Sequence, residues 1–260
     1  MGVAGRRTGC SARTACGGAP PPEGSSTAWS PAARSLLPDP GMHAGVVFHD
    51  RIDGGRWLAA ALMAWRATQP VVVALARGGV PVGYEVARAL GAPLDVLAFR
   101  KLAVPADPSL RVGALAEGGA RYLDMKLIER LGLSIEQLRD VIEAAQVELA
   151  RRVLAYRGDR APIDLRGRTV LLVDDGLATE ASARAAIAAL RPRGPRAIVV
   201  AAPVSAPDTM RALEPEADAV VCARSPSDLS DVARWYEDHS QTSEEEVRWC
   251  VDAALANRVY

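Results

Sequence analysis

Five short apolar runs, each separated from the next by a longer segment, constrain the fold of this chain more than any other feature. They cover residues 71–76, 94–99, 169–173, 197–203 and 219–223. Nearly continuous apolar runs of this length are typical of strands that are buried on both faces of a parallel sheet. The pattern predicts an α/β fold, with a Rossmann-like parallel sheet of about five strands flanked by helices. The carboxyl ends of such strands are where a ligand is expected.

The segments between the strands have helical periodicity. Apolar residues at helical spacing predict helices over residues 55–65 and 80–90. Residues of about 120–160 form an insertion that is too long for a loop, and Ser134 with Gln137 three residues later is a capping-box signature. We expect this insertion to be a small helical hood over the sheet. A second capping sequence, SEEE at residues 243–246, predicts a C-terminal helix.

The first 42 residues differ from the rest of the chain. They are rich in Pro, Gly, Ser and Ala and have no periodicity, which predicts a disordered tail before one domain over residues 43–260. The tail has a weak likeness to a transit peptide, but a true start at Met42 is the favoured interpretation.

Composition excludes several classes of function. The chain has 31 Lys and Arg residues against 31 Asp and Glu residues, so nothing indicates a nucleic-acid or membrane partner. No apolar run reaches the roughly 18–20 residues that a membrane span requires. The four cysteines lack CxxC spacing, which favours a reducing cytoplasm over a disulfide framework.

The candidate chemistry follows the third strand, where Asp174 and Asp175 precede the loop GLATEAS and a helix. Two carboxylates at the sheet edge can accept hydrogen bonds from the vicinal hydroxyls of a ribose. The free amides and the dipole of the helix start attract a phosphate, and Thr179 and Ser182 add hydroxyl groups. The plainer alternative is that the acids only cap a turn. Together with the loop and helix, they favour a sugar-phosphate site.

This stretch resembles the phosphoribosyl-pyrophosphate motif of the type I phosphoribosyltransferases. That motif is an apolar strand, two acids, small residues and Thr-Gly-x-Thr, and the chain has VLLVDDGLATEAS. Four further blocks, FHDRIDGGRWLA, ARGGVPV, RKLAVP and WYEDHSQ, resemble recurrent blocks of a bacterial group of stand-alone predicted phosphoribosyltransferases. The resemblance extends from about Phe48 to about Val251 and implies the type I phosphoribosyltransferase fold.

The resemblance also implies a set of site residues. The ribose and its 5′-phosphate would be held by Asp174, Asp175, Gly176, Leu177, Ala178, Thr179, Glu180, Ala181 and Ser182. The pyrophosphate would be held by Arg77, Gly78 and Gly79, because glycines let amides approach an anion and arginine offers a planar fork. Arg100 and Lys101 would be catalytic, neutralising the charge of the departing pyrophosphate.

The implied reaction transfers phosphoribosyl from phosphoribosyl pyrophosphate to a nitrogenous base and releases pyrophosphate. Mg²⁺ would be carried by the substrate oxygens near Asp174 and Asp175, without a dedicated protein site. Residues 102–113 are the candidate lid. The expected partners are phosphoribosyl pyrophosphate and a small-molecule base, and a homodimer is compatible with the resemblance.

Three segments depart from the family pattern, at four positions. Glu180 replaces the glycine of the phosphate loop, Ala76 replaces the proline of PRGG, and Ser109 and Arg111 replace a Glu and an Ala. Glu180 adds bulk and negative charge where the glycine can supply a positive φ or a close approach. Two alternatives therefore stay open: a catalytically impaired sensor or binding protein that retains the fold, and a different phosphosugar enzyme.

Overall fold

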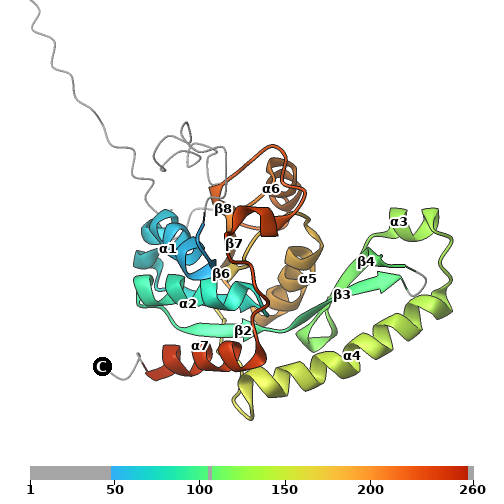
Figure 1. Cartoon of the computed structure of the whole chain (residues 1–260). Helices are drawn as coiled ribbons and strands as arrows, with labels where there is room; N and C mark the ends of the chain where they lie inside the picture. The colour runs from blue at the N-terminus through green and yellow to red at the C-terminus, as the bar shows by residue number, and fades with distance from the viewer. Residues whose placement is uncertain (1–47, 105–106, 257–260) are drawn as a thin grey trace, which may run out of the picture.

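The computed structural model describes residues 48–104 and 107–256, and its centre is a five-stranded parallel sheet (Figure 1). The strands are β1 (Val71–Leu75), β2 (Leu94–Leu97), β6 (Thr169–Val173), β7 (Ala197–Val204) and β8 (Ala219–Arg224). Their order is β2-β1-β6-β7-β8. The chain therefore leaves β1 toward one side of the sheet and later returns to its other side at β6. The crevice at the carboxyl ends of β1 and β6 is the topological switch point.

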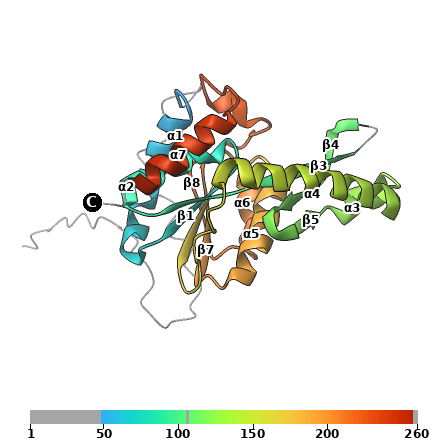
Figure 2. The same ribbon diagram turned by 90° about the horizontal axis from the view of Figure 1, so that it is seen from below.

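Helices cover both faces of this sheet, as the alternation predicted (Figure 2). On one face lie α1 (Arg51–Leu62), α2 (Gly79–Leu90) and α7 (Glu244–Ala256); on the other lie α5 (Ala181–Leu190) and α6 (Pro207–Leu213). Short 3₁₀ segments follow at Met63–Thr68, Arg191–Arg193 and Val232–Trp235. The helix predicted over residues 55–65 begins earlier because Asp50 caps it, its carboxylate accepting from the amide of Asp53 at 2.7 Å.

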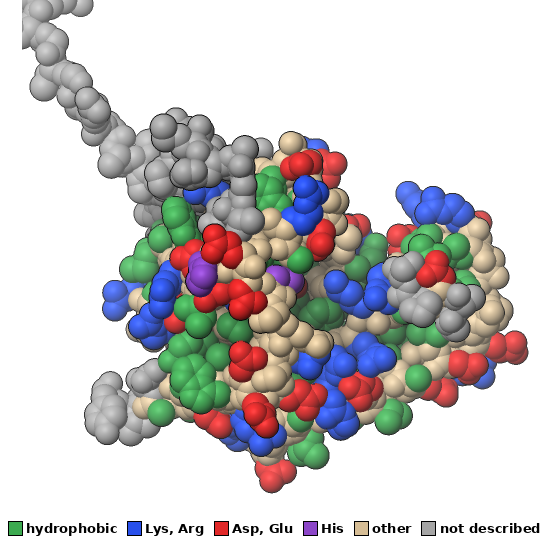
Figure 3. All heavy atoms as spheres, viewed as in Figure 1, with side chains coloured by type: hydrophobic (Ala, Val, Ile, Leu, Met, Phe, Trp, Pro, Cys, Tyr) green, Lys and Arg blue, Asp and Glu red, His purple; other side chains and the backbone are tan. Residues whose placement is uncertain are grey.

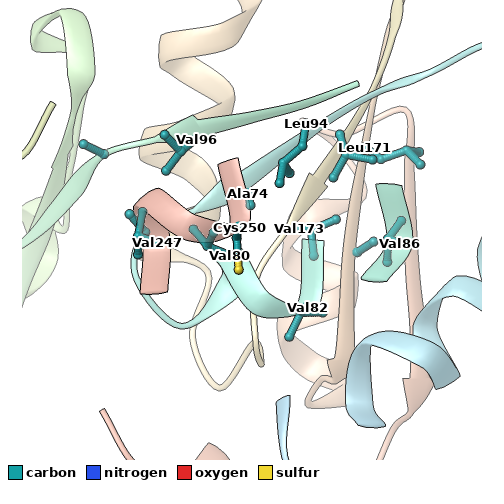
Figure 4. Close-up of a cluster of buried hydrophobic side chains, with 14 of the residues drawn as sticks. Ala74, Val80, Val82, Val86, Leu94, Val96, Leu171, Val173, Val247 and Cys250 are labelled. Atoms are coloured by element: carbon teal, nitrogen blue, oxygen red, sulfur yellow. The ribbon is translucent and has the colours of Figure 1, made fainter. Parts of the chain in front are cut away.

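Alternate residues of each strand point into two different cores. Val72 and Ala74 face α2 and α7, and the cluster there includes Val86 and Cys250 (Figure 4). Val71 and Val73 face the opposite way, toward α5. This double burial is why the strands of the main sheet are nearly continuous apolar runs in the sequence.

In the structure the hood covers residues 99–104 and 107–157, more than the predicted insertion of about 120–160. It contains a sheet that the sequence did not predict. Its antiparallel strands are β3 (Phe99–Val104), β4 (Asp107–Ala116) and β5 (Arg121–Leu123), in that order, with a 3₁₀ turn at Glu117–Gly119. The expected helices follow as α3 (Met125–Arg130) and α4 (Ile135–Arg157). The capping box of α4 is confirmed, since Ser134 and Gln137 exchange both of its hydrogen bonds. The candidate lid, residues 102–113, is the outer part of the β3–β4 hairpin, apart from residues 105–106, which lie outside the described range.

A buried ion network fixes the hood to the sheet. Arg157, at the end of α4, is 5% exposed. Its Nε is 3.2 Å from an oxygen of Asp95 on β2, and its Nη1 is 2.6 Å from an oxygen of Glu117 in the hood. It also donates to the carbonyl of Val96 at 2.6 Å. One guanidinium therefore joins α4, the hood sheet and the main sheet.

Two expectations from the sequence, the disordered tail and the absence of a membrane span, depend on which residues the structure describes. The predicted tail of residues 1–42 lies outside the described residues. Within the described ranges, no helix has the length and apolar character that crossing a membrane would need.

Candidate functional site

The acid pair lies at the switch point of the sheet, against the ARGG loop that follows β1. Asp174 and Asp175 come directly after β6, and Asp174 Oδ1 accepts from the amide of Asp175 at 2.9 Å. A Cβ on Gly79 would lie 2.7 Å from the carbonyl oxygen of Val173, and one on Gly78 would overlap Asp175 Oδ2. A side chain at Gly79 would meet the backbone of Val173 and Asp174, and one at Gly78 would meet the side chain of Asp175, so both positions require glycine. The structure thus brings together two groups that the sequence had placed at separate strand ends.

Asp175 is held by side chains from both ends of the domain. Its Oδ2 accepts from Arg51 Nε at 2.8 Å and lies 3.1 Å from His239 Nε2. The hydroxyl of Tyr236 donates to the carbonyl of Asp175 at 2.6 Å, and burial raises the pKa of this hydroxyl, which keeps it a donor. Arg51 also donates to the carbonyl of Ser240. The orientation of the Asp175 carboxylate is therefore fixed before any ligand arrives.

Backbone pairing explains how these distant residues meet. The amide of Phe48 donates to the carbonyl of Trp235 at 3.2 Å, and that of Glu237 donates to the carbonyl of Phe48 at 2.9 Å. The ring of Tyr236 lies between those of Phe48 and His239, with centroids 5.4 and 5.1 Å away. The sequence blocks FHDR and WYEDHSQ thus form one layer beside the acid pair. Sequence reasoning assigned no role to Arg51 or His239, although both stand in these blocks.

The pKa values of the two carboxyl groups are shifted in opposite directions. Burial and the neighbouring charge of Asp175 raise the pKa of Asp174 well above its ordinary value, although Lys101 acts against this. Burial also acts to raise the pKa of Asp175, but His239 and Arg51 outweigh it and leave that pKa below its ordinary value. Asp175 is therefore the permanent charge of the pair, and Asp174 is the group that readily carries a proton.

The loop after the acids is fixed by contacts with the ends of β7 and α6 and with Val232. Leu177 donates its amide to the carbonyl of Val204 at 2.9 Å, accepts from the amide of Ala206 at 3.1 Å and is buried. The hydroxyl of Thr209 donates to the carbonyl of Ala178 at 3.0 Å. Gly176 has no room for a Cβ because Val232 packs against it. Leu177 and Gly176 therefore hold the loop in place, since their atoms are already engaged in the fold.

The open end of α5 follows this loop. The amide of Arg184 is bonded to the carbonyl of Glu180 at 2.9 Å, so the amides of the preceding helical residues point beyond the helix end. These amides belong to Ala181, Ser182 and Ala183. The hydroxyl of Thr179 is exposed beside them, whereas the side chain of Ser182 is buried. Four of the predicted loop residues, Thr179, Glu180, Ala181 and Ser182, thus lie at the open N-terminus of a helix, where backbone amides can bind an anion as a ligand.

Glu180 is less unfavourable in the loop than its replacement of glycine suggests. Its φ is −79° and its ψ is −15°, which any residue adopts, so no positive φ is needed there. Its carboxylate is 3.6 Å from Arg184 Nη1. Arg184 in turn lies 2.8 Å from Glu216 and donates to the hydroxyl of Tyr122 in the hood at 2.9 Å. The charge of Glu180 is partly offset by an arginine one turn along the same helix.

The predicted cations line a cleft that also includes Ala76, the first residue of the ARGG loop. Arg100 and Lys101 lie on β3, not at the end of the neighbouring strand, since β2 ends at Leu97. The cleft has a volume of about 440 Å³ and is lined by Ala76, Phe99, Arg100, Lys101, Ala103, Arg111 and Arg152. Figure 3 shows Lys and Arg side chains gathered between the domain core and the hood. The positive charge of Lys101 acts to lower the pKa of Asp174.

The remaining predicted residues are placed less directly. Arg77, after the cis peptide bond from Ala76, is half-buried, and its charge acts on Glu244 of α7 and Tyr156 of α4. The side chain of Ser109 is not part of the described structure. Nowhere in residues 48–104 or 107–256 do three His, Cys, Asp or Glu side chains gather closely enough to hold a metal ion.

The parallel sheet, with an acid pair, a glycine loop and an open helix end at its switch point, places the chain in the class of α/β proteins whose ligand site lies at the carboxyl ends of the strands. The profile of the phosphoribosyl transferase domain matches residues 50–242, and the chain belongs to this family.

Several proteins resemble the chain over most of its length. Two Mycobacterium tuberculosis proteins, from strains CDC 1551 and H37Rv and each named "Putative phosphoribosyl transferase", are 41% identical to it over 209 residues, which is 80% of this chain. The chain spans about half the length of these relatives, since the match covers 47% of each. The crystal structure of TT1426 from Thermus thermophilus is 37% identical, with a TM-score of 0.66 over 79% of this chain and 97% of that one.

Proposed function

We propose that this protein binds phosphoribosyl pyrophosphate and transfers its phosphoribosyl group to a nitrogenous base, releasing pyrophosphate. The observation that carries the proposal is the contact between the acid pair and the ARGG loop, in which Gly78 and Gly79 have no space for a side chain against Asp175 and Val173. This contact sets groups suited to a ribose directly beside groups suited to its pyrophosphate. The family match supports the transferase class.

The sugar would be held by both acids and the helix end. Asp175 has Oδ2 occupied by Arg51 and His239, so its other oxygen would accept from a ribose hydroxyl. Asp174 would accept from the second hydroxyl. The 5′-phosphate would take the amides of residues 181–183 and the hydroxyl of Thr179, at the positive end of the α5 dipole.

Charge on the departing pyrophosphate would be neutralised from the hood side. Lys101 and Arg100 line the cleft that includes Ala76, and neither has an acidic side chain as a neighbour in the cleft lining. Bond breaking at the sugar C1 carbon and attack by a ring nitrogen need no enzyme nucleophile. Positioning and stabilisation of the leaving charge would supply most of the rate.

Mg²⁺ fits this site only together with the substrate. The carboxylates that could contact the ion are those of Asp174 and Asp175, and one oxygen of Asp175 is already bound by Arg51 and His239. Because Mg²⁺ prefers six oxygen ligands, most of them would come from substrate oxygens and water. When bound in this way, the ion would offset phosphate charge.

The test is release of pyrophosphate. The protein is incubated with phosphoribosyl pyrophosphate, Mg²⁺ and a mixture of purine, pyrimidine and pyridine bases, and pyrophosphate is measured against a mixture without bases. Base-dependent release that is lost in Asp174→Asn/Asp175→Asn supports the proposal. Binding of phosphoribosyl pyrophosphate without release would instead identify a binding protein that retains the fold.

A further inference from the structure

A buried hydroxyl on α4 has no hydrogen-bond partner in the described part of the chain. It belongs to Tyr156, which is 1% exposed. We propose that Tyr156 is a positioning residue for the pyrophosphate: its hydroxyl oxygen accepts a hydrogen bond from Arg77 and so holds that guanidinium toward the pyrophosphate. This inference rests on the proposed function, because it assigns a further residue to the same site.

Packing alone does not explain this hydroxyl. A buried polar group without a partner lowers the stability of a fold, and a buried tyrosine hydroxyl usually has one. Tyr236, the other buried tyrosine of the described ranges, follows this rule by donating to the carbonyl of Asp175 at 2.6 Å. Phenylalanine would fill the space of the Tyr156 ring without leaving a polar atom unpaired. The hydroxyl therefore indicates a contact that forms when a ligand binds.

The elements around Tyr156 place it beside the ARGG loop. Tyr156 belongs to the same buried cluster as Ala76, the first residue of that loop. Arg152, four positions earlier on α4, lines the cleft together with Ala76. Side chains four positions apart lie on the same face of a helix. Tyr156 is therefore on the face of α4 that is turned toward the loop, one turn beyond the cleft.

Arg77 of the loop is a suitable donor for this hydroxyl. It is half-buried, and its guanidinium makes no hydrogen bond or ion pair with another described residue, whereas Arg152 is engaged by Glu148 at 2.8 Å. Burial raises the pKa of the Tyr156 hydroxyl, and the positive charges of Arg152 and Arg77 act against this. The neutral hydroxyl has lone pairs to offer, and an arginine can only donate. Arg77 and Tyr156 are thus a donor and an acceptor that the rest of the fold leaves unused.

Contacts on both sides of Tyr156 fix its position. The guanidinium of Arg157, the next residue, lies 3.2 Å from Asp95 of the main sheet. That of Arg151 lies 2.6 Å from Glu244, so the end of α4 is joined to the start of α7 (Figure 1). Tyr156 therefore presents its acceptor in a fixed place. An arginine that is already held by one donor loses less freedom when its other donors bind an anion, which improves affinity.

The experiment removes the hydroxyl with Tyr156→Phe. Full-length protein is titrated in a calorimeter with phosphoribosyl pyrophosphate, with pyrophosphate and with ribose 5-phosphate, each in the presence of Mg²⁺. We expect the variant to bind the first two about tenfold more weakly, as the loss of a hydrogen bond to a charged group predicts. Binding of ribose 5-phosphate should stay within about twofold, because this ligand has no pyrophosphate. The melting temperature without ligand should be unchanged or higher, since the hydroxyl has no partner to lose.

A double-mutant cycle tests whether Tyr156 acts through Arg77. Arg77→Gln should weaken pyrophosphate binding by itself, and adding Tyr156→Phe to it should weaken binding no further. The matched control is Tyr84→Phe, which removes the same atom from a ring that packs against Trp249 of α7, with centroids 5.4 Å apart. This control should change none of the three affinities.

Three results would overturn the inference. The first is an unchanged affinity for pyrophosphate in Tyr156→Phe, and the second is a further loss when Tyr156→Phe is added to Arg77→Gln. The third is a lower melting temperature with equal losses for all three ligands, which would mark the hydroxyl as structural. Each of these leaves the proposed function standing. Failure of the wild type to bind either phosphoribosyl pyrophosphate or pyrophosphate would refute the proposed function and this inference together.

Discussion

Replacing Glu180 should improve the binding of phosphoribosyl pyrophosphate modestly, and by charge alone. Glu180 is the residue before α5, makes no side-chain capping bond, and is in a helical conformation at φ −79°. Glutamine and glycine can both adopt this conformation, and neither substitution removes a cap. Glu180→Gln and Glu180→Gly should therefore give equal gains, although a role for the glycine backbone would predict a larger gain for Glu180→Gly.

The size of the gain follows from the surroundings of the carboxylate. A unit charge about 7 Å from a phosphate costs about 0.6 kcal/mol in water and about 2.4 kcal/mol at an effective dielectric constant near 20. The side chain of Glu180 is 35% exposed, and Arg184 Nη1 is 3.6 Å away, so the lower half of this range applies. Arg184 is shared with Glu216, which limits the offset. We expect a gain of about 0.5–1 kcal/mol, roughly two- to fivefold in the dissociation constant.

Calorimetric titration at about 50 and 500 mM salt measures this effect. The gain should shrink at the higher salt concentration because the charge is partly exposed. Glu214→Gln, which removes an exposed carboxylate after α6, is the matched control and should have no effect. A gain above tenfold for Glu180→Gly with none for Glu180→Gln would refute the reasoning, because backbone geometry would then be the limiting factor.

Two further predictions concern buried charge. The raised pKa of Asp174 means that the folded state binds a proton more tightly than the unfolded state, so stability falls as pH rises through that pKa. Asp174→Asn keeps an acceptor for the amide of Asp175. It should raise the melting temperature of the ligand-free protein at pH 8 and weaken sugar binding. A lower melting temperature would contradict this prediction. Arg157→Met leaves the carboxylates of Asp95 and Glu117 without their shared cation and should cost about 3–5 kcal/mol, or at least about 6 °C of melting temperature. A shift below about 2 °C would mean that the network does not hold the hood.

The sequence allowed the main sheet to be predicted because four of its five strands, β1, β2, β6 and β7, are buried on both faces. Residues such as Val72 and Val73 enter different cores, and the strand is then apolar without interruption. The hood sheet escaped prediction for the opposite reason. On β3, Arg100 and Lys101 are adjacent charged residues, and the buried Leu102 and Val104 show only one covered face. Such a short, half-polar strand has no unambiguous signal in a single sequence.

The candidate site could be predicted only where it is local in sequence. The acids and their loop form one continuous stretch, so they could be proposed as a site from the sequence alone. The side chains that hold Asp175 could not be predicted in this way. Arg51 and His239 are 188 positions apart in the sequence and meet because Phe48 and Tyr236 pair like neighbouring strands. The offset of Glu180 by Arg184 follows from helical spacing, yet its sharing with Glu216 depends on tertiary packing.

Calorimetric titration of the wild-type protein with phosphoribosyl pyrophosphate, in Mg²⁺ and again in excess chelator, tests the central claim most directly. We predict saturable binding to one site per chain that weakens on removal of Mg²⁺. In a folded Asp174→Asn/Asp175→Asn variant this binding should be lost. An absence of binding by the wild type, or binding that the double variant retains unchanged, would contradict a phosphoribosyl-pyrophosphate site at the acid pair.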